Sequence, residues 1–434
     1  MKNNRYINGL FTVVLVAAGF LAVACEDEPD KYEIAGGSPT LKYIRVPDPV
    51  AADSLLTGAY MANTICLVGE NMRSVYELYF NDQKAILNTS YITDNTLIVD
   101  VPKEIPAVVT DKIYMVTKSR DTVDYDFKVL VPAPTVNSMS CEYAKPGSEV
   151  TLYGDYFIDD PNVPLAITME GNIAVTNITN ISKTAIRFIL PDNAPEGYIN
   201  VKSIYGTSRS KFRYHDSRGL MFDFDGITGL TNHGWHNREI TTDANAVSGN
   251  YVQLGDGSTA MSEDGGWNDA LFSFEYWCGD WSTPEKFEGT DIKLNDLVDF
   301  TDFQNMSIKF EMCIPKNNAW SAGAMQVIFA GTDLVTLQTA NNDFFHAPAN
   351  PGWPRALYRP WIGTGSFDTN DEWVTVTLPI ASTFVYDETG AAATQALKET
   401  SFSSLTIFVY GGGINGKECT PIIKLDNIRA VPND

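Results

Sequence analysis

The sequence predicts an all-β protein, with two tandem immunoglobulin-like sandwiches followed by a larger jelly-roll-like β-sandwich. Short apolar runs bounded by turn residues fill the chain from about residue 40, and no convincing long amphipathic helix interrupts them. One pattern of strands occurs twice in the first half of the chain. All 8 tryptophans, from Trp235 to Trp373, lie in the second half. We therefore expect two similar small domains and one larger domain of different character.

The length and composition limit the class of protein. The chain has 434 residues, of which 44% are hydrophobic, so each of about three domains can bury a core. Lys and Arg together number 31 against 54 Asp and Glu, which gives a formal net charge of −23. Such a surface repels a polyanion, and no basic stripe is present to bind one. The composition therefore excludes nucleic acid and favours an uncharged partner.

Residues 1–24 resemble a secretory signal peptide. Lys2 and Arg5 precede an apolar run, residues 10–24, which ends at Cys25. The run is too short for a comfortable membrane span. Because it ends on a cysteine, it resembles the lipobox of bacterial lipoproteins, which implies that Cys25 becomes the lipidated first residue. A cleaved, freely secreted protein and a retained N-terminal anchor are the alternatives.

An acidic stretch, residues 26–30, follows Cys25 directly. By composition alone it indicates a solvated tether, which we place at residues 25–39. Acidic residues after a lipobox cysteine resemble the signal that sends Bacteroidetes lipoproteins to the outer face of the outer membrane. We therefore expect a protein that is anchored by lipid to the outer membrane and faces the cell exterior.

The other cysteines indicate no metal or disulfide chemistry. The chain has 6 cysteines and no C-x-x-C pair. Those after Cys25 are far apart and odd in number, so they indicate neither a zinc site nor a disulfide framework. Cys313 lies within a strand pattern and is expected to be a small buried residue.

Residues 40–132 and 133–215 repeat one pattern. In each unit an apolar strand ends at a glycine, and a later strand closes with a proline. An internal repeat of this length indicates a duplicated domain rather than a solenoid. Both units resemble the immunoglobulin-like IPT/TIG domain. The junction at 131–134, Val-Pro-Ala-Pro, predicts a stiff connection. The matching positions are Gly69 and Pro102 in the first unit and Gly154 and Pro191 in the second.

Residues 216–434 are rich in aromatic, Gly and Asn residues but still show strands. The segment 306–314 alternates cleanly, with Met306, Ile308 and Phe310 on one face. Several separated strands with long aromatic loops predict a jelly-roll-like β-sandwich. Carbohydrate-binding modules and lectins often use that architecture, although a fold by itself does not determine function.

Aromatic residues beside turns suggest a sugar-binding platform in this domain. An aromatic face covers the apolar face of a pyranose, while nearby polar groups bond its hydroxyls, and such platforms usually lie on loops held by a rigid sheet. Arg359 offers a fork of hydrogen-bond donors. We expect about half of the tryptophans to be core, because Trp is mostly buried. The predicted glycan-binding residues are Trp320, Phe345, Tyr358, Arg359 and Trp361.

A rival platform remains open. Trp277 and Trp281 flank a short Cys-Gly-Asp segment and form a second pair of candidate rings. Trp373 begins a strand pattern and is therefore expected to lie in the core.

The lipobox cysteine with its acidic follow-on, the tandem IPT-like units and the Trp-rich last domain together resemble Bacteroidetes surface glycan-binding proteins of the SGBP-B type. The resemblance covers essentially the whole chain. It implies non-catalytic binding of a polysaccharide beside a SusC/SusD-like importer in a polysaccharide-utilisation system. Family members bind xyloglucan, mixed-linkage β-glucan, laminarin or β-mannan. Trp320 and the Tyr358…Trp361 segment resemble the family's platform, although here two residues separate Tyr from Trp.

Catalysis and protein adhesion are the competing functions. A glycosidase needs two carboxyl groups at a defined separation, one of them tuned as an acid. The neighbours Glu263 and Asp264 would point to opposite faces of a strand, so they indicate a turn. We therefore predict that the protein is not an enzyme. A surface glycoside hydrolase or lyase of jelly-roll fold, and an adhesin that binds protein, remain the alternatives.

No cofactor is expected, with one metal site left open. Asp223, Asp225, Asp426 and Asn427, at the two ends of the last domain, offer the hard oxygen ligands that Ca²⁺ prefers. Surface turn residues are the alternative interpretation. The 4 histidines show no metal-ligand spacing on a helix.

Together, the net charge, the aromatic loops and the family resemblance predict cell-surface binding of a neutral β-glucan or a hemicellulose such as xyloglucan.

Overall fold

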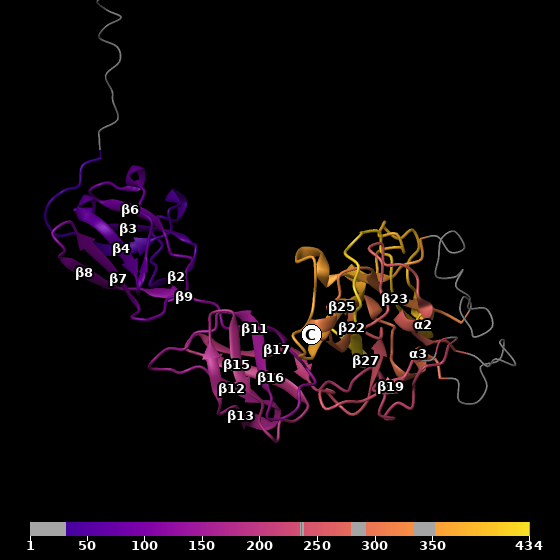
Figure 1. Cartoon of the computed structure of the whole chain (residues 1–434). Helices are drawn as coiled ribbons and strands as arrows, with labels where there is room; N and C mark the ends of the chain where they lie inside the picture. The colour runs from indigo at the N-terminus through magenta and orange to yellow at the C-terminus, as the bar shows by residue number, and fades with distance from the viewer. Residues whose placement is uncertain (1–31, 235, 237, 279–291, 333–351, 434) are drawn as a thin grey trace, which may run out of the picture. The chain divides into compact units, whose positions relative to one another are not determined.

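The structure is a computed structural model that describes residues 32–234, 236, 238–278, 292–332 and 352–433. These residues are almost entirely strands and loops, which confirms the predicted all-β class. None of the helices they form is long and apolar enough to cross a membrane. The chain divides into two compact units, Met1–Pro132 and Ala133–Asp434 (Figure 1).

The first unit is a small sandwich of antiparallel sheets with one parallel pair. Its sheets have the strand orders β1-β3-β6, β5-β4-β7-β8 and β2-β9. The core between them includes Leu67, Leu78 and Leu97, none of which is exposed. The strands are β1 (Thr40–Arg45), β2 (Gly58–Tyr60), β3 (Thr64–Glu70), β4 (Val75–Phe80), β5 (Gln83–Lys84), β6 (Thr96–Asp100), β7 (Lys112–Thr117), β8 (Thr122–Asp126) and β9 (Lys128–Leu130).

The second unit begins with a sandwich of the same kind. Its eight strands follow one path, β13-β12-β16-β17-β10-β11-β15-β14. Leu152, Ile186 and Val201 lie in its core. The strands are β10 (Thr135–Met139), β11 (Glu149–Asp155), β12 (Ala166–Met169), β13 (Ile173–Ala174), β14 (Ile178–Ile181), β15 (Ala185–Ile189), β16 (Gly197–Ser203) and β17 (Gly206–Tyr214).

The two repeated glycines have the same structural role. In the first sandwich β1 shifts register just after its pairing with Gly69 of β3. In the second sandwich β10 shifts register just after its pairing with Gly154 of β11. A Cβ atom on Gly69 would lie 2.0 Å from the carbonyl oxygen of Thr40, and one on Gly154 would lie 1.8 Å from that of Thr135. Only glycine permits so close an approach of two backbones. The repeat in the sequence therefore reflects one shared backbone contact.

The remainder of the second unit is a two-sheet sandwich. One sheet has the order β19-β20-β27-β22-β25, with β18 paired to β27, and the other has the order β21-β26-β23-β24 (Figure 1). The strands are β18 (Leu220–Phe222), β19 (Ile240–Thr241), β20 (Tyr251–Leu254), β21 (Ser273–Tyr276), β22 (Met306–Cys313), β23 (Ala324–Ala330), β24 (Ala356–Tyr358), β25 (Val374–Pro379), β26 (Ser404–Tyr410) and β27 (Ile423–Pro432), and the helices are α2 (Asp269–Phe272), α3 (Leu294–Leu297) and α5 (Ile380–Thr383).

Strand β22 shows how this sandwich joins the preceding one. The predicted alternation is present, and Met306, Ile308 and Phe310 lie in the core between the two sheets. The opposite face of the strand carries Lys309 and Glu311, which are also buried. They are buried because this face packs against the second immunoglobulin-like sandwich.

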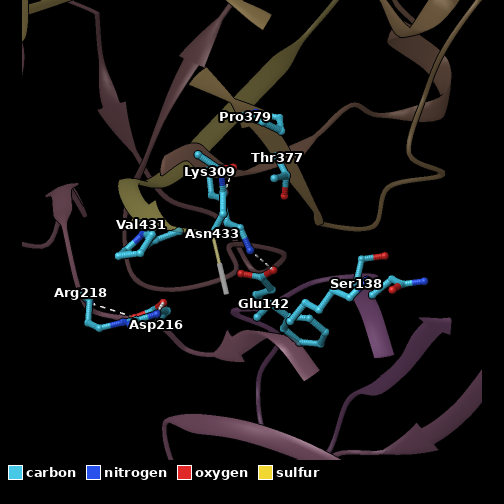
Figure 2. A pocket seen from close by; sticks show the side chains of 14 residues that line it. Ser138, Glu142, Asp216, Arg218, Lys309, Thr377, Pro379, Val431 and Asn433 are labelled. Carbon is cyan, nitrogen blue, oxygen red and sulfur yellow. Dashed lines mark hydrogen bonds and ion pairs between the residues drawn. The ribbon is translucent and has the colours of Figure 1, made fainter. Parts of the chain in front are cut away.

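A buried network of charged side chains crosses this junction. Glu142, after β10, accepts from Lys309 Nζ at 2.6 Å and from Arg429 Nη2 at 2.9 Å. Arg429 Nη1 also bonds Glu311 at 2.7 Å, and its guanidinium lies 4.6 Å from the centre of the Tyr143 ring. Figure 2 shows Glu142 and Lys309 facing one another in a small cavity of about 250 Å³. The two sandwiches of the second unit therefore share a bonded interface.

Candidate functional site

Apart from the main core, an aromatic cluster covers the outer face of the sheet β21-β26-β23-β24 in the last sandwich. Side chains alternate along a strand, so the residues of β21, β23 and β26 that do not enter the main core point outward. Three tryptophans gather on this face with Phe408 and Tyr410. We name these residues the outer aromatic cluster: Trp267, Trp277, Trp353, Phe408 and Tyr410.

Three members of the cluster form its buried base. Trp277 has no exposed surface, and its Nε1 donates to Thr406 Oγ1 at 2.9 Å. Trp353 is also buried and donates from Nε1 to the carbonyl oxygen of Phe329 at 2.9 Å. Phe408 is buried beside them. With their polar atoms satisfied inside the protein, the two indoles are held in fixed positions.

Two rings of the cluster, Trp267 and Tyr410, are only half-buried. The Trp267 ring stands almost perpendicular to its neighbours, with centroids 4.9 Å from Phe408 and 5.0 Å from Tyr410. Such edge-to-face pairs stabilise a defined ring geometry. The half-buried pair is the part of the cluster that presents aromatic surface.

Backbone hydrogen bonds between glycine-containing loops fix the half-buried pair. Gly411, directly after Tyr410, donates to the carbonyl oxygen of Gly265 at 2.8 Å. Gly265 has a φ of +70°, and a Cβ atom there would lie 2.5 Å from the Cα of Gly323. Glycine is therefore required at position 265, where it places Trp267 against Tyr410.

Polar side chains adjoin the pair. Arg355 Nη1 donates to Gln326 Oε1 at 2.7 Å, and Gln326 Nε2 donates to the carbonyl oxygen of Tyr410 at 2.7 Å. Burial lowers the pKa of Arg355 to about 10, against the opposing effect of the Glu388 carboxylate. Arg355 is therefore still positively charged at neutral pH. Burial also raises the pKa of Tyr410, and the carboxylates of Glu388 and Asp264 add to that rise.

The structure contradicts an exposed position for Trp320 and Trp361. Trp320 is 0% exposed and Trp361 is 3% exposed, and both belong to the main core. Their Nε1 atoms donate to the carbonyl oxygens of Ala322 at 2.6 Å and Gly323 at 2.9 Å. Both residues lie beside turns, as predicted, but their rings point between the sheets. A ring with no exposed face has no surface on which a sugar can stack.

Tyr358 and Arg359 are half-buried. The Tyr358 ring lies 6.2 Å from that of Trp320, on the core side of β24, and burial raises its pKa to about 12. Arg359 follows β24 and donates from Nη1 to the carbonyl oxygen of Gly412. Since Gly412 is two residues beyond Tyr410, Arg359 lies at the same end of the sheet as the half-buried pair.

The other candidates fall into two groups. Phe345, Trp281 and Cys25 lie outside the described residues. Trp373 is buried, as predicted, and Trp277, one half of the rival platform, lies at the base of the outer aromatic cluster.

The residues predicted from the sequence did not include Trp267 or Tyr410, the two rings of the cluster that keep exposed surface. A signal for both was present, because Trp267 follows two glycines and Tyr410 precedes three. Such a position leaves an aromatic side chain beside loops that can approach it closely.

The four candidate calcium ligands do not form a carboxylate cluster. Asp223 accepts from the backbone nitrogen of Ile227 at 2.9 Å, and Asp225 accepts from that of Asn250 at 2.7 Å. Asp426 accepts from Ser248 Oγ at 2.8 Å, and burial raises its pKa to about 8. Across the described ranges no group of three or more His, Cys, Asp or Glu residues is arranged to hold a metal ion.

These features define a β-sandwich protein with a partly exposed aromatic face next to polar groups. The family model described as the surface glycan-binding protein B xyloglucan binding domain matches residues 214–432. A crystal structure of surface glycan-binding protein PbSGBP-B from Prevotella bryantii is similar at 47% identity and a TM-score of 0.82. The similarity covers 92% of this chain and 100% of that chain. The chain belongs to the surface glycan-binding protein B family, whose members bind glycans and are not enzymes.

Two further relatives are more distant. An IPT/TIG domain-containing protein from Bacteroides ovatus is 29% identical over 229 residues. That match spans 49% of this chain and 46% of the relative, so it covers less than half of the relative's length. An SGBP-B from a complex xyloglucan utilization locus in Bacteroides uniformis is 15% identical and covers 91% of this chain and 100% of its own, with a TM-score of 0.42. The family resemblance predicted from the sequence is confirmed.

Proposed function

We propose that the protein binds a neutral polysaccharide at the cell surface, a β-glucan or a hemicellulose such as xyloglucan, without cleaving it. The contact surface is the half-buried pair Trp267 and Tyr410, with Arg359 at the same end of the sheet. The observation that carries the proposal is this pair of rings, fixed beside polar groups, in a domain that matches a xyloglucan-binding family.

The charges around the site favour a neutral ligand. The carboxylates of Asp264 and Glu388 act on Tyr410, and the chain has a formal net charge of −23. Arg355 and Arg359 offset these local carboxylates, so the repulsion of a uronic acid polymer comes from the net charge of the whole chain. A neutral glycan meets no such repulsion, and it can exchange hydrogen bonds with the polar groups.

The anchoring and the partners belong to the same proposal. Lipid on Cys25 would hold the protein on the outer face of the outer membrane, and the captured glycan would pass to a SusC/SusD-like importer. The support is the lipobox-like sequence with its acidic follow-on and the surface location of the family. No cofactor is required, because ring stacking and hydrogen bonds suffice for this mode of binding.

The test is isothermal titration of residues 26–434 with xyloglucan, mixed-linkage glucan, laminarin, glucomannan and an acidic control, polygalacturonate. We expect one or more neutral glycans to bind, with the same affinity after EDTA treatment, and polygalacturonate to remain unbound. Tyr410→Ala and Trp267→Ala should each weaken binding at least tenfold, about 1.4 kcal/mol. The matched control is Tyr91→Ala, because Tyr91 is 56% exposed in the first unit.

Each result bears on the proposal. If Tyr410→Ala and Trp267→Ala both bind glycan with wild-type affinity, the half-buried pair is not part of the binding site. A complete lack of binding across the neutral glycans, or release of reducing sugar from any of them, would refute non-catalytic glycan binding.

A further inference from the structure

We propose that a second glycan-binding surface lies in the groove between the two sandwiches of the second unit, distinct from the outer aromatic cluster. The inference rests on the proposed function, since it assigns the same class of ligand. The groove has a volume of about 730 Å³. That volume lies within the range of about 300–1,000 Å³ that is typical of ligand sites.

Both sandwiches contribute to the groove. The second immunoglobulin-like sandwich provides Lys145, Glu149 and Arg187, and the last sandwich provides Glu372 and Trp373. A ligand in the groove would therefore contact both sandwiches at once.

The floor of the groove is apolar and fixed. Trp373 is 8% exposed, and its Nε1 donates to the carbonyl oxygen of Asn245 at 2.6 Å. Its ring packs edge-on against Tyr251 with a centroid distance of 5.6 Å. Val150 and Val247 extend this floor. The floor is rigid but mostly buried, so a ligand in the groove would be held mainly by the polar groups of the rim.

The rim is polar and electrically balanced. Lys145 and Arg187 are exposed, and neither forms an ion pair within the part of the chain that the structure describes. Glu372 is exposed on the opposite wall, and Glu149 accepts a hydrogen bond from Thr179 at 2.6 Å. Two cations and two carboxylates cancel, although the whole chain is strongly acidic. Donors and acceptors without net charge match the hydroxyl groups of a neutral glycan.

The walls are held together before any ligand arrives. The backbone nitrogen of Thr375 donates to the carbonyl oxygen of Ser140 at 3.0 Å, and that of Glu142 donates to Thr375 Oγ1 at 2.7 Å. The buried Arg429 network lies beside these bonds. A preformed groove loses little conformational entropy on binding.

The smaller cavity in Figure 2 does not share these properties. Its volume is about 250 Å³, below the range typical of ligand sites, and four of its five charged lining residues are already paired with one another. Lys309 bonds Glu142 at 2.6 Å, and Arg218 bonds Asp216 at 2.8 Å. The larger groove offers two cations, Lys145 and Arg187, that form no ion pair with any residue that the structure describes, whereas the smaller cavity offers one, Lys211.

Two surfaces on one compact unit would hold a long polysaccharide more tightly than a short oligosaccharide. Once one surface is occupied, the second binds the same chain at a raised effective concentration. We test this with the double substitution Arg187→Ala/Glu372→Ala, made in the native protein and in Tyr410→Ala. The matched control is Lys202→Ala, because Lys202 is an exposed cation of the same sandwich outside the groove.

Binding is measured by affinity electrophoresis and titration with xyloglucan, mixed-linkage β-glucan and their oligosaccharides, after thermal unfolding has shown that each variant is folded. We expect the groove variant to lose about tenfold or more in affinity for a polysaccharide while its affinity for an oligosaccharide at the cluster stays unchanged. In Tyr410→Ala, the residual polysaccharide binding should disappear when the groove substitutions are added. Lys202→Ala should bind like the native protein.

The outcomes separate this proposal from the proposed function. Binding of polysaccharide that depends on Tyr410 and is unaffected by the groove substitutions would refute the groove alone. Capture of polygalacturonate or of an acidic peptide by the groove, in place of neutral glycan, would also refute it. If the native protein binds neither xyloglucan nor mixed-linkage β-glucan, the groove proposal and the proposed function are both refuted.

Discussion

Removing the cation at the centre of the junction network should strongly destabilise the second unit. Arg429 is 0% exposed and bonds Glu311, also 0% exposed, through both terminal nitrogens, at 2.7 and 3.2 Å. Glu142 retains Lys309 in an Arg429→Met variant, but Glu311 loses its only charged partner among the described residues. Removing one partner of a buried pair costs about 3–5 kcal/mol.

The expected loss is large enough to measure by thermal unfolding. At about 2–4 °C per kcal/mol for a domain of about 150–250 residues, Arg429→Met should lower Tm by about 6–20 °C. Tryptophan fluorescence reports this event well, because all 8 tryptophans lie beyond residue 230. The control is Arg213→Met, since the pair of Arg213 with Glu196 is 3.5 Å long and partly exposed. Partly exposed pairs contribute only about 0–1 kcal/mol.

The pH dependence gives a second check. Burial raises the pKa of Glu311, and Arg429 opposes that rise. Without Arg429 the pKa of Glu311 rises further, so the folded variant favours the protonated carboxyl. The destabilisation should therefore be greatest above that pKa and shrink as the pH falls. Arg429→Met/Glu311→Leu should recover much of the loss, because no uncompensated carboxylate remains.

A Tm for Arg429→Met within about 2 °C of the native value at pH 7 would refute this reasoning. So would a loss that is equal at every pH, because it would show that the charge of Glu311 is not involved.

Two further predictions concern stability and domain organisation. Burial raises the pKa of Asp426 to about 8, so the native protein should lose stability as the pH rises from about 4, the unfolded value, towards 8. Asp426→Asn should flatten this dependence and give the higher Tm at pH 8.5, and unchanged curves would contradict the assignment. A fragment of residues 133–434 contains the whole second compact unit, so titration with xyloglucan and mixed-linkage glucan should show an affinity within about twofold of the full chain, about 0.4 kcal/mol. A fragment that unfolds or fails to bind would show that the first unit contributes.

The local patterns of the sequence predicted the strands well. The alternation of 306–314 became β22, and the glycines at 69 and 154 marked equivalent backbone contacts. These features depend on neighbours a few residues away or on a repeated motif. Short-range sterics and the period of side-chain direction therefore sufficed to predict them.

The junction depends on long-range contacts that no local pattern reveals. Lys309 and Glu311 occupy the polar face of an alternating strand, which is typical of a solvent-facing position. In the structure Lys309 bonds Glu142, 167 residues away in the sequence. Only the packing of one sandwich on the other turns this polar face into a buried one.

The burial of Trp320 and Trp361 escaped prediction for a related reason. A turn beside Trp320 or Trp361 places the residue at the end of a strand, but it does not decide which face of the sheet the ring enters. Tertiary packing decides which face the ring enters. In Trp277, Trp320, Trp353, Trp361 and Trp373 the Nε1 atom donates to an acceptor inside the protein, so each ring is an anchor of the fold.

The distinction between anchors and contact surfaces explains how one domain can use so many aromatic rings. Anchored indoles fix the backbone of the loops that carry them, and this rigidity keeps Trp267 and Tyr410 at 5.0 Å from one another. A ring pair that is already ordered loses little side-chain entropy when a sugar stacks on it. In the proposed function, the buried tryptophans hold the half-buried pair in place, and Trp267 and Tyr410 make the contact with the glycan at this cluster.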